Sequence, residues 1–276
     1  RKNEGTFLAR AQVENALFNY QEGWQPAGDL MAEVEFRNQG MRVHATAATV
    51  GNLRMNEATA EIPDFRQNEL SIKAAAASDL DAGLSFLRNS PIGPRLGETF
   101  ARLGGRGAMT ADVRLDLPLK RLDDRKIDVV ARLANATVTM QKVSVAVQSL
   151  TGELRVKNTL VAEADLKGRS LGGPLSVKID QQSATAAQLD AQGHAQASEL
   201  HSLFSLPATV KLAGDTDYHV SMPIASGDSE AAQRRNIKID SNLSGLGVTL
   251  PQPLGKGVAD ERPQGPRVLR VARRRE

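Results

Sequence analysis

Apolar and polar residues alternate along most of the chain with the two-residue period of a half-buried β-strand. In one such stretch, Leu30, Val34 and Phe36 share one parity, whereas Glu33 and Glu35 share the other. The alternation covers residues 30–36, 113–117, 127–133, 143–147, 160–166, 175–179, 218–222 and 237–239. This pattern predicts a mainly β protein.

Short stretches of turn-forming residues separate the predicted strands. They lie at residues 38–40, 51–52, 152, 157–158, 168, 172–174, 214–215 and 245–247. Connections this short predict antiparallel hairpins, because a parallel crossover needs about a dozen residues or more. We therefore expect a long antiparallel meander, and no repeat of fixed length is visible in the sequence.

Two stretches depart from the alternation and show helical spacing. The first follows Asp79, whose side chain can cap a helix, and the second follows two prolines. In both, apolar residues recur at i, i+4 and i+7: Leu80, Leu84 and Leu87, then Leu96, Phe100 and Leu103. We expect an inserted helical pair at about 79–104 that packs on the sheet as a plug or lid. A shorter helix is predicted over 198–204 and an exposed loop over 225–235.

Residues of one parity in successive strands predict a common apolar face. Its members are Leu30, Val34, Phe36, Val113, Leu115, Leu117, Val129, Leu133, Val145, Ala162 and Val177. Such a face can pack against a second sheet, or it can stay open as a groove. The periodicity fits both arrangements.

Composition and charge change this picture only slightly. The 276 residues are 41% apolar, but no window approaches the roughly 18 apolar residues of a membrane-spanning helix. The basic excess lies in the last ten residues, which contain five arginines, so we expect a neutral segment over 1–258 and a disordered basic tail over 259–276. Nucleic acid is not an expected partner, because the ten aromatic residues are mostly Phe at apolar positions.

Candidate chemical sites are few. The absence of cysteine excludes disulfides and thiolate chemistry. The four histidines lack the spacing of a zinc or hydrolytic motif: His44, His194, His201 and His219. Asp215 and Asp217 are spaced like a metal-binding pair, but they lie in a predicted Gly-Asp turn. We expect no catalytic residue, no metal site and no cofactor.

The glycines at positions 104, 105 and 107 follow the second predicted helix, so they fit a helix stop and not a phosphate cradle. The chain opens at Arg1 without Met or an apolar signal segment, in the middle of a pattern. We therefore expect a piece of a longer protein.

Several short sequence strings occur in an order that resembles a known family. They are GWQPAGDL at 23–30, EVEF at 33–36, NSPIG at 89–93, LDLPL at 115–119, LTGEL at 150–154, LGGP at 171–174, and LSGLGV at 243–248 running into LPQPLGK at 250–256. In this order the chain resembles the YhdP family of AsmA-like envelope proteins of Gram-negative bacteria. Residues after Asp260 depart from that pattern.

The resemblance implies a segment of a bridge-like lipid transfer protein, in which a curved, groove-like sheet of the repeating β-groove type shields phospholipid acyl chains. It implies a periplasmic location, a part of the parent chain that anchors it in the inner membrane, and a role in outer-membrane biogenesis. The alternative is a structural β-rich envelope or surface protein, such as an adhesin stalk, whose apolar face forms a closed core.

Overall fold

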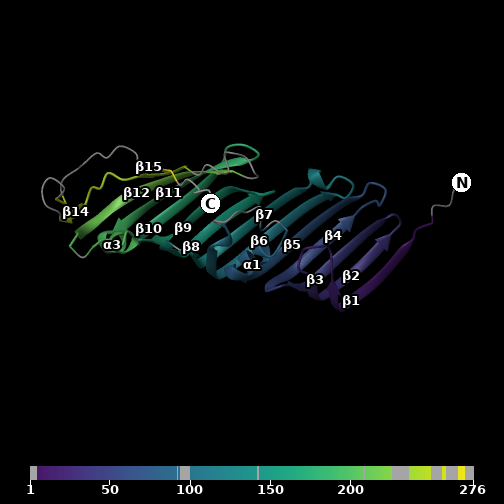
Figure 1. Cartoon of the computed structure of the whole chain (residues 1–276). Helices are drawn as coiled ribbons and strands as arrows, with labels where there is room; N and C mark the ends of the chain where they lie inside the picture. The colour runs from purple at the N-terminus through teal and green to yellow at the C-terminus, as the bar shows by residue number, and fades with distance from the viewer. Residues whose placement is uncertain are drawn as a thin grey trace, which may run out of the picture. The chain divides into compact units, whose positions relative to one another are not determined.

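The computed structural model describes residues 5–91, 93, 100–141, 143–207, 209–225, 236–249, 257–258 and 267–270. The protein is mainly β, as predicted, and each strand follows its sequence neighbour in the sheet from β1 to β13, with β15 beside β13 and β14 beside β12 (Figure 1). The pairings from β1 to β6 and from β9 to β13, together with β12–β14 and β13–β15, are antiparallel, which confirms the meander. The strands are β1 (Leu8–Phe18), β2 (Ala27–Arg37), β3 (Gly40–Val50), β4 (Leu53–Ile62), β5 (Glu69–Asp79), β6 (Leu103–Pro118), β7 (Lys126–Met140), β8 (Val143–Lys157), β9 (Leu160–Ser170), β10 (Gly172–Gln181), β11 (Ala186–Gln196), β12 (Lys211–Ala225), β13 (Asn236–Asp240), β14 (Leu246–Thr249) and β15 (Arg267–Arg270).

The chain divides into two compact units, which are described separately. The first unit contains residues 1–101, 107–133 and 155–159. The second unit contains residues 102–106, 134–154 and 160–276.

The first predicted helix is confirmed as α1 (Leu80–Arg88). The Asp79 carboxylate accepts a hydrogen bond from the Asp81 N–H at 2.9 Å, and its other oxygen accepts one from the Gly107 N–H at 2.9 Å. Asp79 therefore both caps the helix and fastens its start to β6. The short helix expected at 198–204 is also present, as α3 (Ala197–Leu203), and a 3₁₀ turn, η2 (Leu122–Asp124), lies between β6 and β7.

The second predicted helix is wrong at its C-terminal end. Phe100 and Ala101 are helical, but β6 begins at Leu103, so the glycines read as a helix stop lie inside this strand. An ideal Cβ on Gly104 would lie 2.8 Å from the Thr139 hydroxyl, so this glycine permits close approach of a neighbouring strand. Residues 94–99 lie outside the described residues.

Three of the predicted turns are also wrong, because their glycines lie inside strands. Gly152 is in β8, Gly168 is in β9, and Gly214 with Asp215 is in β12. Gly152 has φ +139°, and a Cβ there would overlap the Asp165 carbonyl oxygen. These glycines allow an irregular strand geometry and a close approach of neighbouring backbone. From the sequence alone, a glycine with this role looks the same as a glycine in a turn.

Two expectations fall largely outside the described residues. The loop predicted at 225–235 begins with Ala225, the last residue of β12, and its other residues are not described. Within the predicted tail at 259–276, Arg267–Arg270 form β15 against β13, so these four residues are not a disordered tail.

Gly152 generates a prediction about stability. Gly152→Ala should lower the free energy of unfolding by about 2 to 3 kcal/mol, because the new methyl group meets backbone and the φ angle is strained. Thermal unfolding of the 276-residue chain measures the loss. Gly5→Ala is the matched control, since a Cβ at Gly5 meets nothing within 4 Å; equal melting temperatures for the two variants would contradict the prediction.

Candidate functional site

The strand registers of the first unit line up apolar residues in rows that cross the sheet. Residues directly opposite each other in an antiparallel pair project from the same face. One row runs Ala11, Val34, Val43, Ala60, Ile72 and Leu115, and a second runs Val13, Ala32, Ala45, Ala58, Ala74 and Val113, each through β1 to β6. A third row begins Ala9, Phe36, Met41 and Ile62 and resumes with the pair Leu70 and Leu117. These rows form one continuous apolar face.

The opposite face of the same strands is polar, and several of its charges are paired. The intervening row runs Arg10, Glu35, Arg42, Glu61, Ser71 and Asp116. Arg10 binds Glu35 at 2.7 Å and Arg42 binds Glu61 at 3.2 Å. The hydrogen bond from Arg10 is the largest cause that lowers the pKa of Glu35. The first unit therefore separates an apolar face from a charged one.

Strand β7 adds two predicted residues to this apolar face. Arg132 binds Asp112 of β6 at 2.6 Å, and Asp112 lies on the polar face because Val113 lies on the apolar one. The side chains of Val129 and Leu133 have the opposite parity to Arg132, so they project with Val113. Arg155 also binds Asp128 on the polar side and lowers the pKa of that carboxyl.

All eight predicted residues of the first unit thus share one face. They are Leu30, Val34, Phe36, Val113, Leu115, Leu117, Val129 and Leu133; Leu30 lies two residues before Ala32 of the second row, on the same face of β2. Leu133 is buried, Phe36 is 37% exposed, and the other six are half-buried. The apolar face of this unit is therefore partly accessible.

The second unit has a similar apolar face, but more of the side chains on this face are buried. One row runs Leu166, Val177, Ala191, Val220 and Ile239 across β9 to β13. Ala162 shares its parity with Leu166 and is 0% exposed, whereas Val177 is half-buried. Val145 of β8 is also half-buried.

A bend of the sheet explains this burial. Some Cα atoms of β9 lie within 8 Å of Cα atoms in β11 and β12, which are two and three strands away. A flat sheet, with strands about 4.8 Å apart, would separate these strands by roughly 10 and 14 Å. The buried side chains lie on the apolar face, so the bend encloses that face.

Helix α1 covers part of the apolar face of the first unit. Phe86 packs with Leu30 and Met55 on a buried cluster of Ala27, Ala48 and Val50. Its ring lies 5.6 Å from that of Trp24, which lies 6.4 Å from Tyr20, and burial raises the pKa of Tyr20. Helix α1 therefore packs on the sheet, but the packing residue is Phe86, which lies outside the predicted stripe of Leu80, Leu84 and Leu87; of these three, Leu80 is buried.

The polar face of the second unit contains a histidine that contacts two carboxylates. His194 Nδ1 lies 2.7 Å from Asp217, and its Nε2 lies 3.3 Å from Asp215. The two aspartates are in β12, so their assignment to a turn is wrong. They are alternate residues of this strand and project from the same face as His194 of β11, which is opposite Asp217. Within the described residues, no group of three or more His, Asp or Glu side chains could hold a metal ion.

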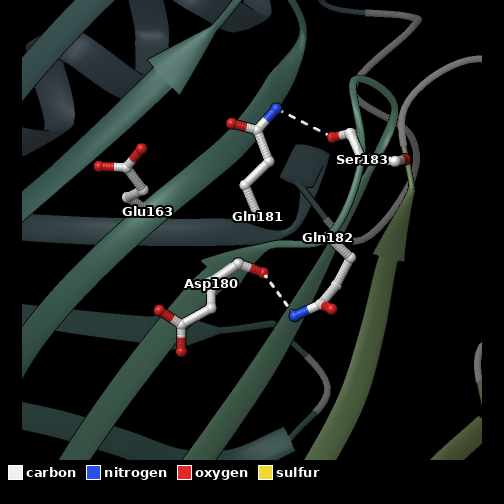
Figure 2. Close-up of a pocket in the computed structure, with 5 residues that line it drawn as sticks. All are labelled: Glu163, Asp180, Gln181, Gln182 and Ser183. Carbon is white, nitrogen blue, oxygen red and sulfur yellow. Dashed lines mark hydrogen bonds between the residues drawn. The ribbon is translucent and has the colours of Figure 1, made fainter.

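A pocket in the second unit is polar and does not resemble a site for hydrocarbon. Glu163, Asp180, Gln181, Gln182 and Ser183 line it (Figure 2). The Gln181 amide donates to the Ser183 carbonyl at 2.9 Å, and the Gln182 amide donates to that of Asp180 at 3.4 Å. These contacts belong to the turn after β10. The apolar face is the stronger candidate site.

The sequence pattern did not predict four of the seven strands that build this face. It did not assign β1, β3, β4 or β5, whose inward residues are largely alanine, such as Ala58, Ala60 and Ala74. Alanine is a weak marker of a buried strand position, although its two-residue period is present in these stretches. In the described residues, no helix is long and apolar enough to span a membrane.

Comparisons with known proteins point to one family. The family model described as YhdP protein matches residues 1–264. The chain is 25% identical over 263 residues to the intermembrane phospholipid transporter YhdP of Escherichia coli (strain K12), an alignment that covers 93% of the chain and 20% of that relative. The chain thus spans about a fifth of the relative's length. No solved structure matches.

The contact between α1 and Trp24 can be followed by fluorescence, because Trp24 is the only tryptophan in the sequence. Phe86→Ala should shift Trp24 emission to the red, increase its quenching by acrylamide, and lower stability by about 2 kcal/mol, since it removes a packed ring. Phe65→Ala removes a ring that is 43% exposed and should leave the emission unchanged. An unaltered spectrum in the Phe86 variant would refute the packing.

His194 should titrate above its ordinary value. The hydrogen bond to Asp217 raises its pKa above 6.5, Asp215 adds to this, and partial desolvation opposes it. Because the folded pKa is the higher one, this stabilisation is complete below pH 6.5 and is lost as the pH rises through the folded value. NMR titration should show a lower His194 pKa in Asp217→Asn, and no change in Asp165→Asn on the same face. A pKa unaffected by Asp217→Asn would exclude this coupling.

Proposed function

The chain belongs to the YhdP family, and from this membership we propose that it is a segment of a periplasmic lipid-transport protein whose apolar face shields phospholipid acyl chains. The parent protein would connect the inner and outer membranes and would be anchored in the inner membrane by another part of its chain. The relative's description as an intermembrane phospholipid transporter supports phospholipid as the cargo.

The observation that carries this proposal is the continuous, partly accessible apolar face of the first unit. Six of its predicted residues are half-buried, so their side chains can still contact a ligand: Leu30, Val34, Val113, Leu115, Leu117 and Val129. An acyl chain that enters water loses about 0.8 kcal/mol per CH₂. A lipid that crosses an aqueous compartment therefore needs an apolar wall without interruptions, and rows that cross six strands supply one.

The dimensions of the rows suit an acyl chain. Six strands spaced by about 4.8 Å span roughly 24 Å. Half of the hydrocarbon core of a bilayer is about 15 Å thick, so a lipid tail extended along a row fits within the first unit. The side chains are small and aliphatic, which favours contact without a deep pocket that would hold the lipid in place.

The proposal needs no reaction chemistry. The arrangement of the histidines supports this view, because His194 and His219 lie on the polar face and contact aspartates. We therefore propose a non-enzymatic role without cofactor, metal or nucleic acid. The inward surface, and not a set of reactive groups, would determine what is carried.

The structural alternative is supported by one feature of the second unit. Leu160, Ala162 and Ala187 are at most 2% exposed on its apolar face, as expected for a closed core. A β-rich envelope protein with a purely structural role would need such packing in both units. The accessible residues of the first unit favour lipid contact over that reading.

A charge on the apolar face tests the proposal. Val129→Asp in the full-length parent should abolish support for outer-membrane lipid supply while the protein stays folded, because a carboxylate on an accessible face keeps its water and repels hydrocarbon. Val130→Asp is the matched control, since Val130 has the opposite parity in β7, and it should retain transport. Protease resistance and melting temperature report the fold.

Two results would contradict the proposal. If Val129→Asp unfolds the protein outright, the face is a closed core at this position and the structural reading is favoured. If the variant remains folded and transports lipid normally, position 129 does not contact the cargo. Leu115→Asp, on the same face in β6, repeats the test at an independent position.

A further inference from the structure

The exposed apolar side chains of the first unit gather at the two ends of its strands, and six of them lie at one end. These six are Phe7, Leu8, Phe36, Phe65, Leu119 and Leu122. They belong to, or flank, residues 37–42, 63–69 and 119–126, which we call the turn rim. The apolar face continues onto this rim, because Phe36 belongs to the third row, which is the row nearest to the rim.

Backbone hydrogen bonds hold the parts of the turn rim side by side. The Asn38 N–H donates to the Phe7 carbonyl at 2.9 Å, and the Phe65 N–H donates to the Gln39 carbonyl at 2.7 Å. The Leu119 N–H donates to the Asn68 carbonyl at 2.8 Å. Successive connections thus form one continuous border of the apolar face.

The positive charge of the turn rim is concentrated in the connection between β6 and β7. Residues 119–126 contain four basic and two acidic side chains. Arg121 pairs with Asp124 at 3.4 Å, whereas Lys120 and Lys126 have no ion pair within the part of the chain that the structure describes. The arginines elsewhere on the rim are paired: Arg37 with Glu35, Arg42 with Glu61, and Arg66 with Asp64.

The other border of the first unit differs in charge and in cover. It consists of residues 19–26, 51–52 and 79–91, which we call the helix rim. These ranges contain three acidic residues, Glu22, Asp79 and Asp81, and one basic residue, Arg88, which binds Asp81 at 3.4 Å. Helix α1 and Trp24 cover part of the apolar face there, although Leu17, Phe18 and Tyr20 remain exposed. The turn rim is therefore uncovered and basic, whereas the helix rim is partly covered and has more acidic than basic side chains.

We propose that the turn rim binds the phosphate-bearing headgroup of the phospholipid, so that the lipid has a fixed orientation on the apolar face. This inference rests on the proposed function. A phosphate at the turn rim is attracted to the unpaired ammonium group of Lys120. Lys126 adds a second positive charge at the start of β7, although it shares the parity of Asp128 and its side chain leaves the strand on the polar face. The acidic helix rim repels the phosphate. The exposed Leu119, Leu122 and Phe65 cover the first methylene groups below the headgroup. The apolar face thus determines that a lipid binds, and the charge difference between the rims determines which way it points.

Photoreactive lipids test the orientation directly. The purified full-length parent is loaded from vesicles of phosphatidylglycerol that carry a diazirine either in the headgroup or at the end of an acyl chain. Mass spectrometry of the digested protein then locates the adducts. The headgroup probe should label residues 119–126 at least about fivefold more than residues 51–52 and 79–91, and the acyl probe should label the apolar face. A diacylglycerol probe, which lacks the phosphate, should show no preference between the rims.

Paired variants identify the charges responsible. Lys120→Glu with Lys126→Glu should reduce headgroup labelling of the turn rim about tenfold and leave acyl labelling in place. Lys73→Glu with Arg114→Glu makes the same change in charge on the polar face, where these two residues are opposite each other in β5 and β6. That control should keep the wild-type pattern.

The outcomes separate this inference from the proposed function. Acyl labelling of the apolar face with headgroup labelling equal on both rims would overturn the inference and leave the proposed function standing. Absence of acyl labelling on the face would overturn both. A photoreactive residue in place of Phe65 that yields adducts between two protein chains, and none with lipid, would assign the rim to a second copy and refute the headgroup site. Excess inorganic phosphate should not compete; full competition would show a site for free phosphate instead.

Discussion

The structure depends on the fact that opposite residues of paired antiparallel strands project from the same face. A shift of one residue in any pairing would move a whole strand's apolar residues to the charged side. The registers of β1 to β6 avoid this, since Val34, Val43 and Ile72 meet apolar partners in every neighbouring strand. The polar face reinforces the register, because Arg10 and Glu35 or Arg132 and Asp112 bind only when the strands are correctly aligned. These pairs are exposed to solvent, which screens them, so their effect is on alignment more than on stability.

β-bulges keep apolar residues on one face of a strand where the two-residue alternation of the sequence is interrupted. The β1–β2 register shifts between Val13 and Ala16, and the β2–β3 register shifts after Gly28. Asn15 and Asp29, with φ of +50° and +49°, lie at these irregularities. Each bulge adds a residue without turning the strand over, so apolar residues continue on the same side. Bulges also bend strands, which matters for a face that must be partly open in one unit and enclosed in the other.

The two units show how similar patterns of residues give different surfaces. In the second unit the bend between β9 and β12 buries Ala162 and Leu160 against neighbouring strands. In the first unit α1 covers one end of the face, and residues such as Leu115 remain accessible. Cover and curvature, and not the hydrophobicity of single positions, therefore decide where hydrocarbon could bind. The unpaired lysines, Lys120 and Lys126, likewise lie at the turn rim, the border of the first unit that helix α1 does not cover.

The sequence by itself determined the strand periods, the antiparallel meander, the cap at Asp79 and the shared parity of residues such as Leu30, Val113 and Val129, because these features are local and follow from the two-residue repeat. It could not separate a glycine in a turn from one inside a strand, as at Gly152 and Gly214. In both places the glycine adopts a backbone conformation with positive φ that other residues rarely adopt. It also placed Asp215 and Asp217 in a turn, although their contacts with His194 come from a strand 21 or more residues earlier. Accessibility of the apolar face and the position of the charged rim were decided by tertiary structure alone, because both depend on which distant segments lie beside each strand.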